Sequence, residues 1–288
     1  MSWHADAREL AQRAGLDPRY LRRWRWISKA RAVRRAGGSL SSNLGYVLTD
    51  PEPNNFSYEL ANESDMIAWV AAVARCSPDD ARRVTDEAHS DPVLRQRLRA
   101  ATEGHWAWSK PEPPFGKRLG WYALVRLLSP GLVIEAGVHD GLGSLLLLRA
   151  LELNAGEGPQ ARLVSFDVNP AAGWLAAGHP GWELRLESTR SGLPTLLADA
   201  PQVDLFIHDS LHTYEHERFE LRTVAPRLSP GGVLVSDNVH ATPALTETSE
   251  EFGFEYHEFY ERPRDHFYTG GAVGAARRLS DRANPDTP

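Results

Sequence analysis

The 288-residue sequence contains one cysteine, three lysines and no long apolar run. A single thiol cannot form an internal disulfide, and Cys76 lies in a segment with the pattern of an amphipathic helix, so we expect neither a disulfide scaffold nor cysteine catalysis. No stretch approaches the roughly 18 apolar residues that a membrane-spanning helix needs, and the first residues lack the apolar core of a signal peptide. These absences predict a cytoplasmic protein without a membrane partner.

Apolar residues make up 42% of the sequence and charged residues 24%, which is the composition of a globular protein rather than a disordered one. The net charge is −6, but the first 35 residues hold ten basic and only three acidic side chains. This basic leader leaves RNA binding open as an alternative, although the acidic remainder would repel phosphate. Apolar side chains recur at helical spacing between its arginines, which predicts a helix whose apolar face suits a homodimer contact.

Residues 1–108 have a helical pattern, interrupted by a loop-rich stretch over 37–62. Helix-capping residues that support this pattern are Ser64, Ser77 before Pro78, and Asp91 before Pro92. We expect this region to form an N-terminal helical cap or oligomerisation region, followed by a proline-rich linker over 109–116. The prediction is completed by a domain over 117–280 and a disordered tail over 281–288.

Beyond the linker, helical and strand patterns alternate. The helices are predicted at 118–128, 144–153, 170–177, 193–198, 214–228 and 243–252, and the strands at 132–136, 162–166, 183–186, 203–207, 233–236, 255–261 and 268–276. This alternation predicts βαβ units and therefore a parallel sheet covered by helices on both faces. The last two strands would form an antiparallel hairpin. The predicted fold class is thus α/β, with a doubly wound, Rossmann-like sheet of seven strands.

A glycine-rich segment lies between the first predicted strand and the next helix, where ligands of doubly wound sheets bind. Its glycines at 137, 141 and 143 permit close approach of a ligand but lack the spacing of the dinucleotide fingerprint G-x-G-x-x-G. The segment resembles motif I of class I S-adenosylmethionine-dependent methyltransferases, E/D-x-G-x-x-x-G-x-S/G. The residues that this resemblance implies as the cofactor site are Glu135, Gly137, Gly141 and Ser144. A simple tight turn is the alternative.

In that fold an acidic residue ends the second strand, where one carboxylate accepts hydrogen bonds from both ribose hydroxyls. Asp167 directly follows the strand pattern 162–166 and meets this expectation. Ser188, just past the third predicted strand, corresponds to the region that contacts adenine. A glycine loop and an acid, each at the end of the appropriate strand, favour S-adenosylmethionine as the cofactor.

Two further carboxylates, Asp209 and Asp237, follow the fourth and fifth predicted strands. These strands are neighbours in the class I sheet, so both carboxylates are expected at the same edge, with the amide oxygen of Asn238 beside them. An all-oxygen set of this kind suits a hard cation such as Mg²⁺. The alternative is that both aspartates serve as helix caps and turn residues.

The arrangement of these acids resembles the catechol O-methyltransferase pattern, in which such residues hold Mg²⁺. The residues around Asp209 look more like bacterial macrocin and other sugar O-methyltransferases, and the likeness covers about 117–278. Catechol enzymes place a lysine near the first acid as the base, whereas no lysine follows Lys117 here. In this departure from the family pattern, His212 is the natural replacement for the lysine and the predicted catalytic base beside Asp209.

The sequence offers alternatives to His212 as the base and further candidate site residues. His240 is the rival base, and His216 is expected to be a surface or packing residue. His212 itself could cap or pack its helix instead. Candidates for the wall of an acceptor pocket, with core packing as the alternative, are Trp106, Trp108, Trp121, Tyr122 and the hairpin tip over 261–268.

The predicted function is methyl transfer from S-adenosylmethionine to a hydroxyl of a small metabolite, a natural-product sugar or phenol, with Mg²⁺ assisting. Asp209 and His212 are the predicted catalytic residues, and Asp209, Asp237 and Asn238 the predicted metal ligands. The runner-up is a metal-independent N- or carboxyl-methyltransferase that uses His212 as the base. RNA binding through the basic leader is the alternative from another class.

Overall fold

The computed structural model describes residues 57–103, 114–155, 161–200, 202–264, 266, 268 and 270–279. The basic leader, Trp106, Trp108, most of the expected linker and the expected tail lie outside these described residues. The chain divides into two compact units, one comprising 1–62, 91–116 and 262–270 and the other 63–90, 117–261 and 271–288. Every residue predicted to bind the cofactor or the metal, or to act as a catalytic residue, belongs to the second unit.

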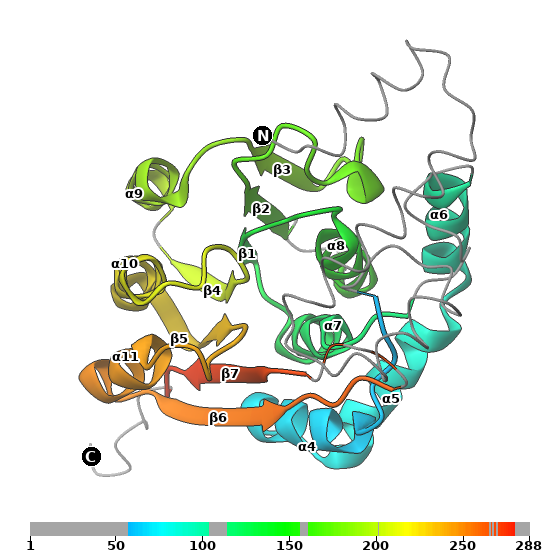
Figure 1. Ribbon diagram of the computed structural model, residues 1–288, viewed down its shortest axis with the longest axis horizontal. Coiled ribbons are helices and arrows are strands. Elements are labelled where there is room, and N and C mark those ends of the chain that lie inside the picture. Colours follow the sequence, from blue (N-terminus) through cyan, green and yellow to red (C-terminus); the bar gives the residue numbers. More distant parts are fainter. Residues whose placement is uncertain are drawn as a thin grey trace, which may run out of the picture. The chain divides into compact units, whose positions relative to one another are not determined.

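The described part of the second unit contains a seven-stranded sheet with the order β3-β2-β1-β4-β5-β7-β6 (Figure 1). The strands are β1 Leu132–Ala136, β2 Arg162–Phe166, β3 Trp182–Arg185, β4 Val203–His208, β5 Leu228–Ser236, β6 Glu255–Tyr260 and β7 Ala272–Arg277. The first five are parallel neighbours, and β7 runs antiparallel between β5 and β6. The predicted doubly wound α/β sheet, including its antiparallel last strand, is confirmed.

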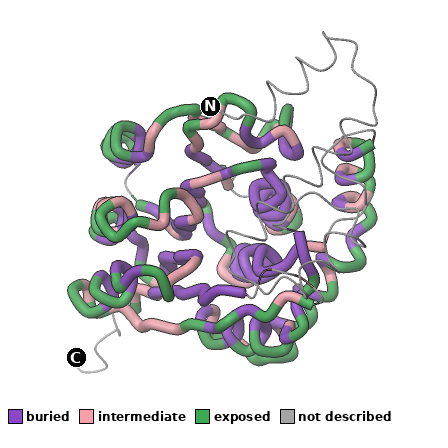
Figure 2. Tube along the Cα trace, viewed as in Figure 1, coloured by how far each residue is buried: buried purple, intermediate pink, exposed green. Residues whose placement is uncertain are grey.

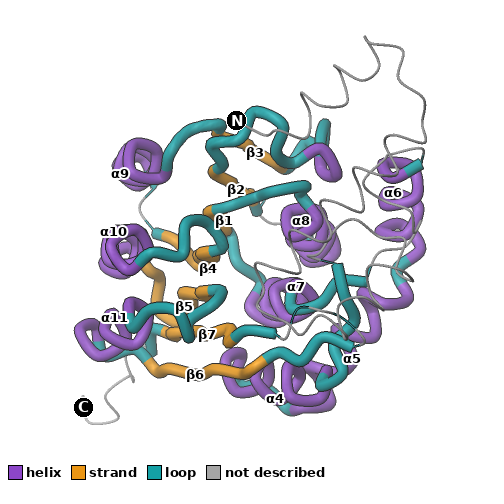
Figure 3. Tube along the Cα trace, viewed as in Figure 1, coloured by secondary structure: helices purple, strands orange, loops and turns teal. Residues whose placement is uncertain are grey.

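Helices cover both faces of this sheet (Figures 1 and 3). On one face lie α9 (Thr189–Asp199), α10 (Tyr214–Val224) and α11 (Ala244–Phe252), and on the other α7 (Arg118–Leu128) and α8 (Leu142–Asn154). All five residues of β1 are buried, as expected for a central strand packed on both sides (Figure 2). Apolar side chains such as Ile134, Phe166 and Phe206 form the core between the sheet and the first group of helices.

Two helices that precede the expected linker pack in the same unit as the sheet. They are α4 (Glu63–Ala74) and α5 (Pro78–Ser90). Glu87 of α5 accepts hydrogen bonds of 2.6 Å from the Tyr122 hydroxyl and the Arg126 Nε of α7. The Trp69 ring of α4 lies 5.1 Å from the Phe259 ring of β6. Trp121 and Tyr122 are fully buried, so they are core residues.

The first unit contains α6 (Pro92–Thr102) and the tip of the β6–β7 hairpin. Asp91 caps α6 as predicted, because its Oδ1 accepts from the backbone N–H groups of Val93 and Leu94 at 2.8 and 2.9 Å. In the hairpin tip, the rings of His266 and Tyr268 lie 5.4 and 5.7 Å from that of Tyr58. No helix in the described residues of either unit is long and apolar enough to cross a membrane.

Several predicted elements differ from the structure. The helix expected over 170–177 is only a 3₁₀ turn, η1 (Trp174–Ala176), because Gly173 and Gly178 adopt positive φ on either side of it. The helix from Tyr214 ends at Val224 and is followed by a second 3₁₀ turn, η2 (Ala225–Arg227), where Pro226 lacks the N–H that helix continuation needs. Strand β5 begins at 228 rather than 233, and β7 at 272 rather than 268.

Candidate active site

The carboxyl ends of β1, β2, β4 and β5 lie along one edge of the sheet, because these strands are parallel neighbours. The strand order reverses between β1 and β4, since β2 and β3 lie on one side of β1 and β4 and β5 on the other. Ligands of open α/β sheets bind outside the carboxyl ends at such a reversal. The predicted site residues follow these strand ends.

The glycines of the loop after β1 are required by close packing of backbone on backbone. Gly137 has φ +92°, and a Cβ built on it would lie 2.1 Å from the carbonyl oxygen of Asp209. Gly141 also has φ +92°, and its Cβ would lie 2.9 Å from the Cα of Gly173. No larger side chain fits at either position without movement of the backbone. The loop after β1 therefore lies directly against the loop after β4.

Glu135, the acidic residue of β1, is buried with 1% of its surface exposed. Its Oε2 accepts hydrogen bonds from the hydroxyls of Ser144 and Ser165 at 2.6 and 2.7 Å. Burial raises the pKa of Glu135 to about 7, although the two hydroxyls lower it. Glu135 and Ser144 thus support the glycine loop from inside the protein.

Asp167 connects the end of β2 to the same loop. Its Oδ2 accepts hydrogen bonds from the backbone N–H groups of Val138 and His139 at 2.9 and 3.0 Å. Ser188 is the N-cap of α9 and accepts from the backbone N–H of Arg190 at 3.3 Å. Beside Asp167, the side chain of Val168 is 74% exposed and offers an apolar surface at this edge.

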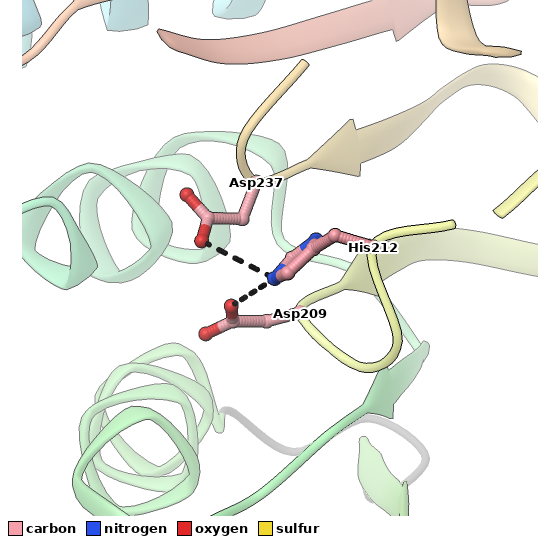
Figure 4. Close-up of side chains that lie close together, drawn as sticks. All are labelled: Asp209, His212 and Asp237. Atoms are coloured by element: carbon pink, nitrogen blue, oxygen red, sulfur yellow. Dashed lines mark ion pairs between the residues drawn. The ribbon is translucent and has the colours of Figure 1, made fainter. Parts of the chain in front are cut away.

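The carboxylates of Asp209 and Asp237 point toward the imidazole of His212 (Figure 4). His212 Nε2 lies 3.6 Å from Asp209 Oδ1 and 3.9 Å from Asp237 Oδ2. One ligand atom from each of the three residues lies within 4.8 Å of the others, a spacing that suits a single metal ion. Asp237 is 2% exposed, and its Oδ1 has no hydrogen-bond partner among the described residues.

Lys117, which was not predicted as a site residue, completes this cluster. The Nζ of Lys117 forms an ion pair with Asp237 Oδ2 and lies 3.5 Å from Asp209 Oδ1. Lys117 directly precedes α7, and α7 leads into β1. A helix that leads into a parallel strand begins at the carboxyl edge of the sheet. The position of Lys117 directly before this helix therefore indicates that it lies at the same edge as the two aspartates. The sequence-based prediction assigned no role to Lys117, because the family pattern places its lysine near the acid of the fourth strand.

The charged groups of the cluster shift one another's pKa values. Burial acts to raise the pKa of Asp209, but the Lys117 ammonium and the His212 imidazole hold it well below its usual range. Burial and the negative charge of Asp209 raise the pKa of Asp237 to about 7, although Lys117 opposes this shift. Burial lowers the pKa of His212, but the adjacent carboxylates outweigh it and the net direction is upward. Of the two carboxylates, Asp209 is therefore the more readily ionised.

Asn238 adjoins the cluster with its backbone at φ +56°. Its Nδ2 donates to Asp237 Oδ2 at 2.7 Å and lies 3.3 Å from His212 Nε2. The amide nitrogen therefore faces the cluster, in place of the oxygen expected as a metal ligand. In this arrangement Asn238 orients Asp237.

The remaining histidines have other partners. His216 forms an ion pair of 2.8 Å with buried Glu220, which also lies 2.5 Å from His208 Nδ1. Burial raises the pKa of Glu220, but hydrogen bonds with these histidines lower it to about 2. The His208 ring packs edge-on against His212, with centroids 5.2 Å apart. His240, the rival base, is exposed and accepts through Nδ1 from the backbone N–H of Ala272 at 3.1 Å.

Residues 134–239 match a family model described as a methyltransferase domain. The chain contains a methyltransferase domain. The matched range begins in β1 and ends just after Asn238, so it spans the glycine loop, Asp167 and both carboxylates of the cluster. With the strand order of the sheet, this match confirms the predicted class I methyltransferase.

No curated protein matches the chain in sequence. Among solved structures, the O-methyltransferase TomG from Streptomyces achromogenes, involved in tomaymycin synthesis and in complex with SAM, is 20% identical. The match covers 66% of this chain and 91% of TomG, with a TM-score of 0.47. An O-methyltransferase from Bacillus cereus in complex with SAH is 12% identical, with 74% of this chain and 99% of that chain covered and a TM-score of 0.48.

Proposed function

We propose that the methyltransferase domain transfers a methyl group from S-adenosylmethionine to a hydroxyl oxygen of a small metabolite, with Mg²⁺ bound at the Asp209–Asp237 pair. The observation that carries the proposal is the contact between the loops after β1 and β4. At Gly137 a Cβ would lie 2.1 Å from the backbone of Asp209, so a donor on the first loop is adjacent to the acidic cluster. Methyl transfer requires this proximity of donor and nucleophile.

The donor half of the proposed site is the loop after β1 together with the end of β2. Asp167 is the carboxylate available to the ribose hydroxyls, and the exposed Val168 beside it offers an apolar contact to adenine. The loop glycines leave the backbone without side chains where the methionine part would lie. Glu135 and Ser144 hold the loop from beneath.

The residues of the cluster fit a divalent cation. Two carboxylates and one imidazole nitrogen lie within 4.8 Å of one another, and the buried Asp237 Oδ1 has no partner in the described chain. The two carboxylates would hold Mg²⁺ or Mn²⁺ through oxygen, which leaves the imidazole of His212 beside the ion. When bound, Mg²⁺ would supply positive charge that stabilises an acceptor oxyanion.

His212 is the proposed base for the acceptor hydroxyl. Its imidazole lies at the edge of the cluster with 28% of the side chain exposed, so one face is open to an acceptor. Asp209 and Asp237 orient the ring through Nε2 and favour the imidazolium that forms when it takes the proton. A sugar or phenol hydroxyl is mostly protonated at neutral pH and requires such a base. The proposed acceptor class is therefore a hydroxylated small molecule.

A metal-independent version of the reaction is the second candidate. It is favoured by the Lys117 ammonium, which already provides a positive charge between the two carboxylates. In that version His212 alone accepts the proton, and an amine or carboxyl group is an equally suitable acceptor.

The test measures release of S-adenosylhomocysteine with a panel of catechols, sugars and related hydroxylated metabolites. Asp209→Ala and Asp237→Ala should each lower turnover by at least about a thousandfold while binding of S-adenosylmethionine persists, because the donor half of the site is unchanged. Asp199→Ala, at the exposed end of α9, is the control and should retain full activity. Full activity in both cluster variants would refute the proposal, and activity that survives EDTA would select the metal-independent version.

A further inference from the structure

The Lys117 ammonium and the proposed divalent ion would use the same two oxygen atoms. Lys117 Nζ pairs with Asp237 Oδ2 and lies 3.5 Å from Asp209 Oδ1. His212 Nε2 approaches these same atoms at 3.9 and 3.6 Å. The ammonium therefore lies where the candidate ligands converge.

Burial prevents both cations from sharing this position. The side chains of Lys117 and Asp237 are 8% and 2% exposed, so little water is available to screen a second positive charge. Two carboxylates balance the charge of one divalent ion, and an ammonium that stayed between them would repel that ion at close range. A divalent ion that takes two carboxylate ligands here must therefore replace the ammonium.

The surroundings of Lys117 offer the ammonium other partners. The Trp121 ring lies 5.7 Å from Nζ, within the range of a cation–π contact. The buried carboxylate of Glu261 also attracts the ammonium electrostatically. A rotation of the flexible lysine side chain would exchange these partners without movement of the backbone.

We infer that Lys117 is the resident cation of the Asp209–Asp237 pair and that a divalent ion binds only in exchange for its ammonium, so that Lys117 sets the metal affinity of the enzyme. The inference rests on the metal site of the proposed function and adds a residue that controls it. Without metal, Lys117 offsets part of the negative charge of the two buried carboxylates.

The experiment measures Mn²⁺ binding to the full chain by electron paramagnetic resonance, with Mg²⁺ competition. Lys117→Met removes the competing charge and keeps the length of the side chain, so it should bind Mn²⁺ at least about tenfold more tightly than the wild type. Lys117→Arg keeps the charge and should bind no more tightly than the wild type. Arg75→Met, which removes a surface cation paired with Glu255, is the matched control and should leave the affinity unchanged.

A double variant, Lys117→Met with Asp237→Ala, locates the ion. It should lose the gain in affinity, and a gain that persists would place the ion elsewhere and overturn the inference. Equal affinity of the wild type and Lys117→Met would overturn the exchange but leave the metal site of the proposed function intact. Absence of Mn²⁺ binding in both would overturn the exchange and the metal site together.

Lys117→Met removes a positive charge beside two buried carboxylates, so its unfolding is measured as well. Saturating Mn²⁺ should raise the melting temperature of Lys117→Met by more than that of the wild type, because tighter binding to the folded state stabilises it more. An equal rise in both proteins would contradict the exchange.

Discussion

Buried charges in the methyltransferase domain are compensated in groups. Lys117 lies between two carboxylates, and Glu220 accepts from Thr189 and pairs with two histidines. Glu135 differs, because hydroxyl groups rather than a cation contact its carboxylate. An isolated carboxylate in the interior is stabilised in its neutral form, which is why the pKa of Glu135 lies near 7.

Glu135 should make the stability of the domain fall as pH rises. Its pKa is about 7 in the folded chain and near 4.5 when unfolded, so the folded state holds the proton more tightly. The stabilisation is complete below about pH 4.5 and is lost as pH rises through about 7, a difference of about 3 kcal/mol. In Glu135→Gln this dependence should vanish.

The measurement is urea unfolding of the wild type and Glu135→Gln at pH 5 and pH 8. Taking the difference between the two proteins cancels the titration of all other groups. The wild type should lose about 2.5 kcal/mol more than the variant between these pH values, because part of the full difference is already lost at pH 5. Identical losses would show that Glu135 is already ionised in the folded protein at pH 5.

At the scale of elements, the loop after β1 decides whether the two halves of the site meet. Gly137 and Gly178 both have positive φ, +92° and +79°. They differ in surroundings, because a Cβ at Gly178 meets nothing within 4 Å while one at Gly137 meets the backbone of Asp209. Substitutions at these two glycines therefore separate two costs in folding free energy, that of a positive φ and that of a steric clash with neighbouring backbone.

Gly178→Ala should cost about 1 kcal/mol of folding free energy, the penalty for positive φ alone. Gly137→Ala should cost about 3 kcal/mol or more and weaken S-adenosylmethionine binding, because the β1 and β4 loops must move apart. Urea unfolding and calorimetric titration of both variants provide the measurement. Equal losses in the two variants would mean that contact between the loops is not essential.

The elements that the sequence predicts well are those with a local cause. Strands β1 and β2 have the predicted bounds, because their apolar runs are bounded by turn residues and are buried on both faces. The helix expected over 170–177 was wrong, since two glycines with positive φ limit it to a short turn. The start of β5 depends on pairing with β4 across an irregular register, which no local pattern records.

In the candidate site, too, the residues whose position has a local cause were predicted and the others were not. Asp209, Asp237 and His212 follow strand ends, so the topology alone brings them together. Lys117 lies 92 residues before Asp209 in sequence and reaches the cluster only through the position of α7 beside the sheet. Similarly, the amide orientation of Asn238 depends on its hydrogen bond to Asp237 and cannot be read from the sequence.

At the scale of the whole molecule, function depends on the reversal of strand order between β1 and β4. The donor half of the site follows β1 and β2, and the acidic cluster follows β4 and β5. Neighbouring parallel strands bring these halves to one edge although they are distant in sequence. The edge after β1 and β2 is the proposed binding site of S-adenosylmethionine, on which the proposed function depends.

The most direct test is calorimetric titration of S-adenosylmethionine into the full chain, with and without Mg²⁺, for the wild type, Asp167→Ala and the control Asp199→Ala. We predict binding with a Kd in the micromolar range to the wild type and the control, about tenfold or more weaker in Asp167→Ala because a ribose contact and two loop hydrogen bonds are lost. Absence of binding to the wild type under both conditions, or equal binding to Asp167→Ala, would contradict the account.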